Sequence, residues 1–107
     1  MLCREMGFLY GEGRVLLNRG NLYNLQGHAY QALHHYDAAI DVFQKLQNAR
    51  GLALARLNRV SQHIALFGAG PVDFEMVAQV MNYAREVDDD VTIAQCQSIM
   101  GACHLAQ

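Results

Sequence analysis

The chain has 107 residues with 8 basic and 10 acidic side chains, so it is one domain or part of one and carries a formal charge of -2. Charged residues make up 17% of the chain, against roughly 25% in an average soluble domain, while 52% are apolar or aromatic. This composition excludes a disordered tail, and the near-neutral charge without a basic stripe argues against direct nucleic-acid binding.

Cysteine usage and the N-terminal residues indicate the compartment. Cys3, Cys96 and Cys103 form no Cys-x-x-Cys pair and are odd in number, which argues against a disulfide-stapled secreted fold. Arg4 and Glu5 stand where a signal peptide needs its apolar core. No apolar run approaches the ~18 residues of a membrane-spanning helix. We therefore expect a cytoplasmic protein without a membrane segment.

The first predicted elements are helical. Residues 1–11 are expected to form the end of a preceding helix, in a stretch interrupted by glycines. From Val15 to Leu25 apolar residues recur at intervals of three and four, and Gly27 supplies the backbone freedom that ends a helix. A second helix is predicted from about Ala29 to Leu46, with a core face formed by Tyr30, Leu33, Ala39, Ile40 and Phe43.

Residues 48–51 are predicted to link this helix to a third. The third helix runs from about residue 52 to residue 67 and stops at the break 68–71. Its apolar positions are Leu54, Leu57, Val60, Ile64 and Phe67.

Two more helices complete the prediction. Pro71 suits the first turn of the fourth, where a missing N–H is not needed. Residues 88–90 are three aspartates, which favour the start of a helix, and a fifth helix runs from about Val91 to the end. The apolar stripe of the fourth helix is Phe74, Val77, Val80, Met81, Ala84 and Val87.

The chain also contains an internal repeat. Gly20, Ser61 and Gly101 are 41 and then 40 residues apart, and the segments around them align. Gly27 and Gly68 are also 41 residues apart. Since no strand alternation is present, the pattern predicts an all-α solenoid of antiparallel helix hairpins. A small residue at the three repeat positions would let the two helices of a hairpin approach closely.

The first complete unit resembles the tetratricopeptide repeat, in a longer variant of about 40 residues. The family's small residue, tyrosine, turn glycine, alanines and aromatic are matched by Gly20, Tyr23, Gly27, Ala32, Tyr36 and Ala39. The resemblance implies a right-handed superhelical solenoid of about five helices. Its units would be residues 13–47, residues 52–87 and a partial unit 90–107, within a longer array.

In proteins of this family the first helix of each hairpin lines a concave groove that holds an extended peptide. The resemblance implies a protein or peptide partner and a non-catalytic interaction module. Amides can pair with a peptide backbone and arginine with a carboxylate. Leu17, Leu25 and Leu66 would add apolar contact. The implied groove residues are Arg14, Asn18, Asn21, Asn24, Asn58, Arg59 and Gln62, with Gln95 and Ser98 in the partial unit. The alternative is an effector-sensing region of a bacterial transcription regulator or signalling ATPase.

No metal, cofactor or catalytic site is predicted. His34 and His35 are adjacent and point to different faces of a helix, and neither they nor His63 has a metal-ligand residue type four positions later. Cys96 and Cys103, with His104 beside them, lack a third group for nucleophilic catalysis. Free cysteine is usually buried, so we interpret these thiols as core residues.

The fifth helix contains no charged residue. A helix that is apolar on nearly every face needs neighbours on both sides. We therefore expect the chain to belong to a longer array, or to self-associate or exchange helices as an isolated homo-oligomer.

The repeat register makes Gly20 a residue of close helix contact. We predict that Gly20→Leu collapses the stack, because the added side chain forces the helices of the first hairpin apart. Circular dichroism and size-exclusion chromatography measure this. A soluble, monodisperse and fully helical variant would contradict the register.

Overall fold

A computed structural model describes the backbone of residues 2–105 and the side chains of residues 7–101. The side chains of Cys3, Cys103 and His104 therefore lie outside the described residues. Within them the chain forms five helices and no strands, which confirms the all-α prediction. The helices are α1 (Leu2–Leu25), α2 (Ala29–Leu46), α3 (Ala49–Phe67), α4 (Pro71–Glu86) and α5 (Asp90–Leu105). None of these helices combines the length and hydrophobicity needed to cross a bilayer.

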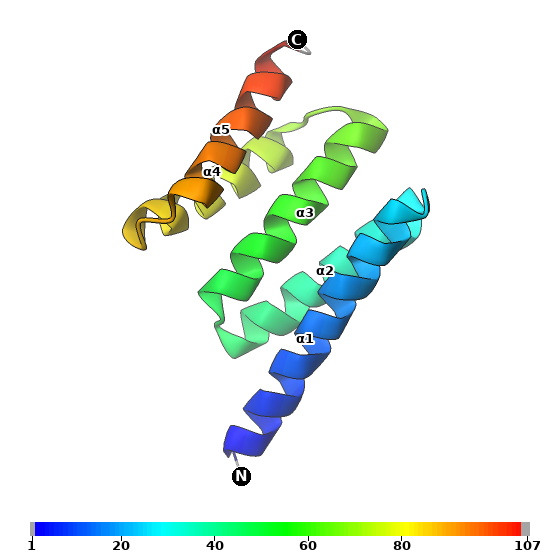
Figure 1. Cartoon of the computed structure of the whole chain (residues 1–107), viewed down its shortest axis with the longest axis vertical. Helices are drawn as coiled ribbons and strands as arrows, with labels where there is room; N and C mark the ends of the chain where they lie inside the picture. The colour runs from blue at the N-terminus through cyan, green and yellow to red at the C-terminus, as the bar shows by residue number, and fades with distance from the viewer. Residues whose placement is uncertain (1, 106–107) are drawn as a thin grey trace.

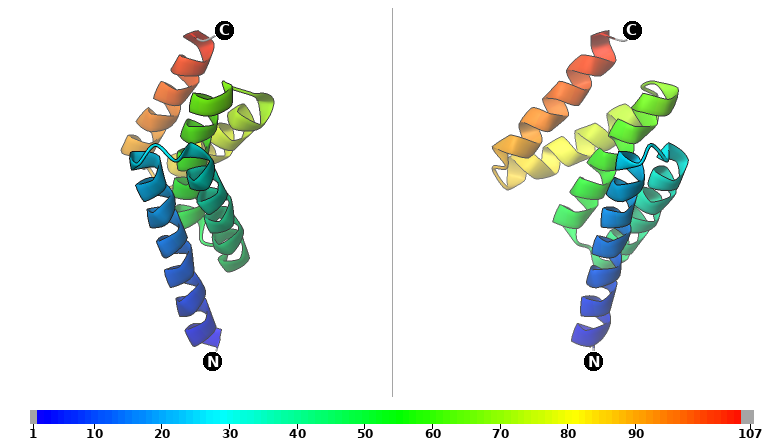
Figure 2. Two further views of the ribbon diagram at one scale, coloured as in Figure 1. Left: turned by 90° about the vertical axis from the view of Figure 1, so that its right-hand side faces the viewer. Right: turned by 45° about the vertical axis from the view of Figure 1, so that its right-hand side comes forward.

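The helices run up and down in sequence order, each packed on the next. The molecule measures 50 × 33 × 21 Å, and the two ends of the chain lie at opposite ends of its long axis (Figure 1). α1 and α5 lie on one side and α2 and α4 on the other, with α3 between them (Figure 2). α1 also touches α3 directly. Residues of α1 and α3, and of α3 and α5, line shared hollows, so these three helices border a common face.

The helix ends follow local signals. Gly27 and Gly68 both adopt a φ of 81°, a left-handed conformation that glycine tolerates without strain. Asn48 caps α3 by accepting a hydrogen bond from the Gly51 N–H at 2.9 Å. The predicted link 48–51 was therefore wrong, because this cap starts α3 at Ala49. At the start of α5, Asp89 accepts from the N–H and hydroxyl of Thr92, and these bonds lower the pKa of Asp89.

Residues 2–11 are helical as predicted, but they are part of the continuous helix α1 and do not end a preceding one, so that part of the prediction was wrong. Gly7, Gly11 and Gly13 all lie inside it. A glycine costs a helix about 1 kcal/mol relative to alanine, but α2 packs along α1 and supports it. Tertiary contact thus outweighs the local preference.

Aromatic side chains of α2 pack directly on glycine backbones of the flanking helices. Phe43 is 1% exposed, and a Cβ added at Gly13 of α1 or Gly51 of α3 would lie 2.8 or 2.5 Å from its ring. Tyr36 is equally buried, and a Cβ at Gly20 would lie 2.6 Å from its ring. The close approach expected at Gly20 is therefore confirmed, with an aromatic ring as the contact.

A second core joins α3 to the C-terminal half of the chain. Leu57 and Val60 of α3 meet Val77 and Val80 of α4, and Cys96 of α5 completes the cluster. The opposite side of α3 packs on α2 through Ala55 and Phe43. α3 is thus buried on two sides and connects the two cores.

Several residues predicted to face the core lie on the surface. Tyr30 lies in the first turn of α2 and Phe67 ends α3. Their ring centroids are 6.1 Å apart, and the two side chains are 67% and 59% exposed. Leu54 and Val87 are also exposed. Tyr30, Phe67 and Val87 lie at or next to helix ends, where fewer neighbouring residues cover them. Leu54 lies at the edge of α3 that turns toward the common face of α1 and α5. Ala39, Phe43, Leu57, Val60, Val77, Val80, Met81 and Ala84 are buried as predicted.

The three repeat positions do not share one environment. The ring of Tyr36 occupies the space beside Gly20. Ser61 is exposed, and a Cβ at Gly101 meets no described atom within 4 Å. The close helix approach is therefore shown at Gly20 alone, and at Ser61 and Gly101 it stays a prediction. Among the described side chains of α5, Cys96, Ile99 and Met100 pack on the core formed with α3 and α4, whereas Val91 is 69% exposed.

Two glycines of α1 that are two residues apart test the role of Phe43. Gly13→Ala should lower the free energy of unfolding by about 1–3 kcal/mol, because its methyl group would overlap a buried ring. Gly11→Ala should raise it by about 0.5–1 kcal/mol, because the site is open and alanine favours a helix. Urea unfolding of dilute protein measures both values. Equal effects at the two positions would contradict the packing.

Candidate functional site

Two hollows lie along the common face of α1, α3 and α5. The first, of about 330 Å³, lies between α1 and α3. Its lining is Tyr10, Arg14, Leu17, Asn18, Phe43, Asn48, Arg50, Gly51 and Leu54. The second, of about 320 Å³, lies between α3 and α5. Its lining is Leu54, Leu57, Asn58, Ser61, Gln95, Ser98 and Ile99. Since Leu54 lines both, we describe them together as the groove.

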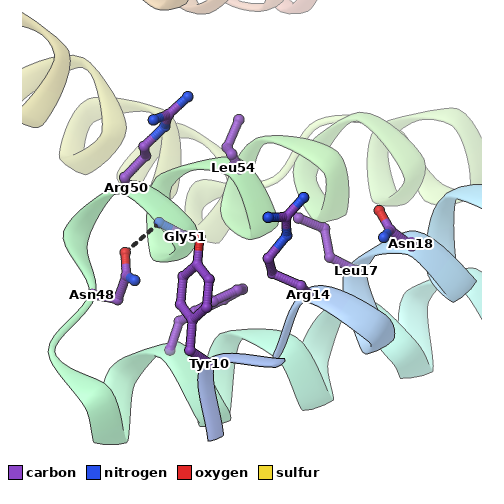
Figure 3. A pocket seen from close by; sticks show the side chains of 9 residues that line it. Tyr10, Arg14, Leu17, Asn18, Asn48, Arg50, Gly51 and Leu54 are labelled. Carbon is purple, nitrogen blue, oxygen red and sulfur yellow. Dashed lines mark hydrogen bonds between the residues drawn. The ribbon is translucent and has the colours of Figure 1, made fainter. Parts of the chain in front are cut away.

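The first hollow is basic. Arg14 from α1 and Arg50 from α3 extend around the same opening as Leu54 (Figure 3). Arg14 also lies over the Tyr10 ring, with its guanidinium carbon 5.9 Å from the ring centroid. Among the described residues no acidic side chain lines this hollow. Asp89, outside the lining, lies near enough to Arg50 for the guanidinium charge to help lower the pKa of that carboxyl. Two guanidinium groups in a lining without a carboxylate favour an anionic group.

The second hollow is neutral and rich in hydrogen-bonding groups. Asn58 on α3 faces Gln95 and Ser98 on α5 across an opening with an apolar base that includes Leu57. Amide side chains both donate and accept hydrogen bonds, which suits a peptide backbone. The two hollows are therefore lined by five of the residues that the family resemblance implied for a groove: Arg14, Asn18, Asn58, Gln95 and Ser98.

Asn21 links the two sides of the groove rather than facing its opening. Its Oδ1 accepts a hydrogen bond from the Tyr36 hydroxyl at 2.7 Å and another from Asn58 Nδ2 at 3.2 Å. Burial raises the pKa of Tyr36, so its hydroxyl stays protonated and remains a donor. Asn21 therefore ties α1 to α2 and holds the amide of Asn58 in place.

Three other predicted residues line neither hollow. Arg59 donates to Asp37 of α2 at 2.6 Å, on a different side of α3 from Asn58. Gln62 is buried and Asn24 is exposed beyond the end of the groove. Adjacent helical residues point about 100° apart, so Asn58 and Arg59 cannot share one face. Of the predicted apolar contacts, Leu17 lines the first hollow, whereas Leu25 and Leu66 line neither.

Sequence reasoning missed Tyr10 and Arg50. Arg50 stood in a predicted loop, and only recognition of Asn48 as a cap would have placed it in the first turn of α3. Tyr10 lies one turn before Arg14 on α1, so a continuous first helix would have revealed it. Both omissions come from misplaced helix boundaries.

Cys96 is packed in the core, and His63 and Asp73 bond to each other, so these three groups serve the fold. Cys96 is fully buried, and burial raises the pKa of its thiol, so it remains protonated and unreactive. His63 Nδ1 lies 3.0 Å from Asp73 Oδ2, which also accepts from the Gly70 N–H at 2.8 Å. These hydrogen bonds connect the end of α3 and the turn after it to the first turn of α4. Among the described residues no three His, Cys, Asp or Glu side chains gather as a metal site would need.

Comparisons with protein-family models, curated proteins and solved structures find no match to this chain.

The Asn21–Tyr36 bond makes a prediction about stability. Asn21→Ala should lower the free energy of unfolding by about 1–3 kcal/mol, because it leaves the part-buried Tyr36 hydroxyl without its partner. In a Tyr36→Phe background the same substitution should cost less. Asn18→Ala, on the exposed surface of the same helix, should change stability by less than about 0.5 kcal/mol. Urea unfolding of the wild type, the two single variants and the double variant measures the coupling free energy between Asn21 and Tyr36. Equal costs of Asn21→Ala in both backgrounds would contradict the predicted bond.

Proposed function

We propose that this chain is a non-catalytic protein–protein interaction module that holds an extended peptide in the groove between α1, α3 and α5. Its helices belong, in this proposal, to a right-handed, tetratricopeptide-like superhelical solenoid. The up-and-down order of the helices, each packed on the next, and the close contact at Gly20 support that architecture. The peptide would lie across the first helix of each hairpin.

The observation that carries the proposal is the composition of the groove lining. Arginines gather at the α1 end, amides and a serine at the α5 end, and Leu54 connects them. Apolar burial by Leu17, Leu54 and Ile99 provides the affinity, while the polar groups orient the chain. The ligand best matched to this lining is an extended peptide with an acidic side chain held between Arg14 and Arg50.

The polar side chains of the second hollow orient the peptide along the groove. Asn58 is already oriented by Asn21, so it loses little side-chain freedom when it binds a peptide group. Gln95 and Ser98 lie one turn apart on α5 and face it across the second hollow. A peptide that spans both hollows would place its acidic residue beside α1 and its backbone beside α5.

Selection from a random peptide library tests the proposal. Peptides bound by the wild-type chain should contain Asp or Glu. The double variant Arg14→Ala/Arg50→Ala should weaken their binding at least about tenfold, or ~1.4 kcal/mol, in fluorescence anisotropy. Higher salt should weaken wild-type binding, because the pairs are exposed.

The matched control removes a charge elsewhere. Arg85 is exposed near the end of α4, away from both hollows, so Arg85→Ala should bind as the wild type does. If the selected peptides lack acidic residues, or if the double variant still binds them, the proposed binding site in the groove is wrong.

A further inference from the structure

A third side of α1 lines neither hollow and is exposed. Phe8, Val15 and Leu22 are spaced seven residues apart and are 74%, 48% and 54% exposed. This spacing aligns side chains along one stripe of a helix. The stripe borders an apolar hollow of about 540 Å³. We call the surface the outer face, defined by Gly7, Phe8, Gly11, Glu12, Val15, Arg19 and Leu22.

The two glycines of the outer face contact no described side chain. A Cβ added at Gly7 or Gly11 meets no described atom within 4 Å, whereas aromatic rings pack against Gly13 and Gly20. Each exposed helical glycine costs about 0.5–1 kcal/mol relative to alanine. Two of them one turn apart leave bare backbone that a second helix can approach closely.

The charges of the outer face are self-complementary. Glu12 precedes Val15 by three residues and Arg19 follows it by four. Neither forms an ion pair with another described residue. If a second copy packs antiparallel with a two-fold axis near Val15, each Glu12 lies beside Arg19 of the other copy. Phe8 then meets Leu22 of the other copy. A parallel pair would instead set like charges level with one another.

We propose that the outer face of α1 is the contact surface for a second copy of this chain, packed antiparallel about a two-fold axis near Val15. The same patch on both copies forms an isologous interface, the commonest kind in homodimers. Three apolar side chains per copy make a small interface, so a micromolar dissociation constant is expected. The inference is independent of the proposed peptide groove, because the outer face shares no residue with the linings of the two hollows.

Charge reversal and charge exchange test both the surface and the orientation. Sedimentation velocity of the full chain, from about 1 to 200 μM, should show a monomer–dimer equilibrium. Glu12→Arg and Arg19→Glu should each raise the dissociation constant at least about tenfold, because each creates two repulsive pairs per dimer. The double variant Glu12→Arg/Arg19→Glu should return it to within about threefold of the wild type.

The control carries the same charge change on another helix. Glu75 is exposed on α4, so Glu75→Arg should leave dimerisation unchanged, and circular dichroism should show equal helicity in all variants. A wild-type chain that remains monomeric over the whole range overturns the proposal. A dimer insensitive to both single reversals assigns the interface to another surface. A double variant as weak as the singles overturns the antiparallel orientation.

Discussion

The packing of the Phe43 ring against glycine backbones sets the geometry on which the rest of the structure depends. α2 presents this ring between α1 and α3, and Gly13 and Gly51 let both backbones reach it. Tyr36 repeats the arrangement seven residues earlier, against Gly20. Because glycine has no side chain, the spacing of these helices is fixed by the thickness of rigid rings. Phe43 also lines the hollow between α1 and α3, so the same contact sets the width of the groove.

The three sides of α1 have different roles in the fold and in the two proposals. Gly13 and Gly20 face α2 and hold the fold together, while Arg14 and Asn18 line the groove. A third side carries Phe8, Val15 and Leu22. A helix can serve three surfaces because successive residues rotate by about 100°. A peptide and a second copy of the chain can therefore occupy α1 together, and dimerisation would present two grooves on one assembly.

The groove was predictable in part. Periodicity and the repeat placed Arg14, Asn18 and Asn58 on the first helices of hairpins, and these side chains line the two hollows. The sequence could not separate Asn58 from Arg59, because both are polar and both lie on α3. Arg59 turns instead toward Asp37, and Gln62 is enclosed between helices. Arg50 joined the groove only because Asn48 starts α3 earlier than periodicity indicated.

The sequence by itself determined that the chain is helical and where most helices end. Apolar periodicity is a property of consecutive residues, and the left-handed turns at Gly27 and Gly68 follow from glycine's freedom at a single position. Only the tertiary structure decided which side of each helix became core, groove or open surface. That choice depends on the direction from which neighbouring helices approach, as Tyr30 and Leu54 show by lying exposed among residues of the same polarity that are buried. The conformation of a helix follows from its own residues, whereas the burial of a side chain depends on how several helices pack together.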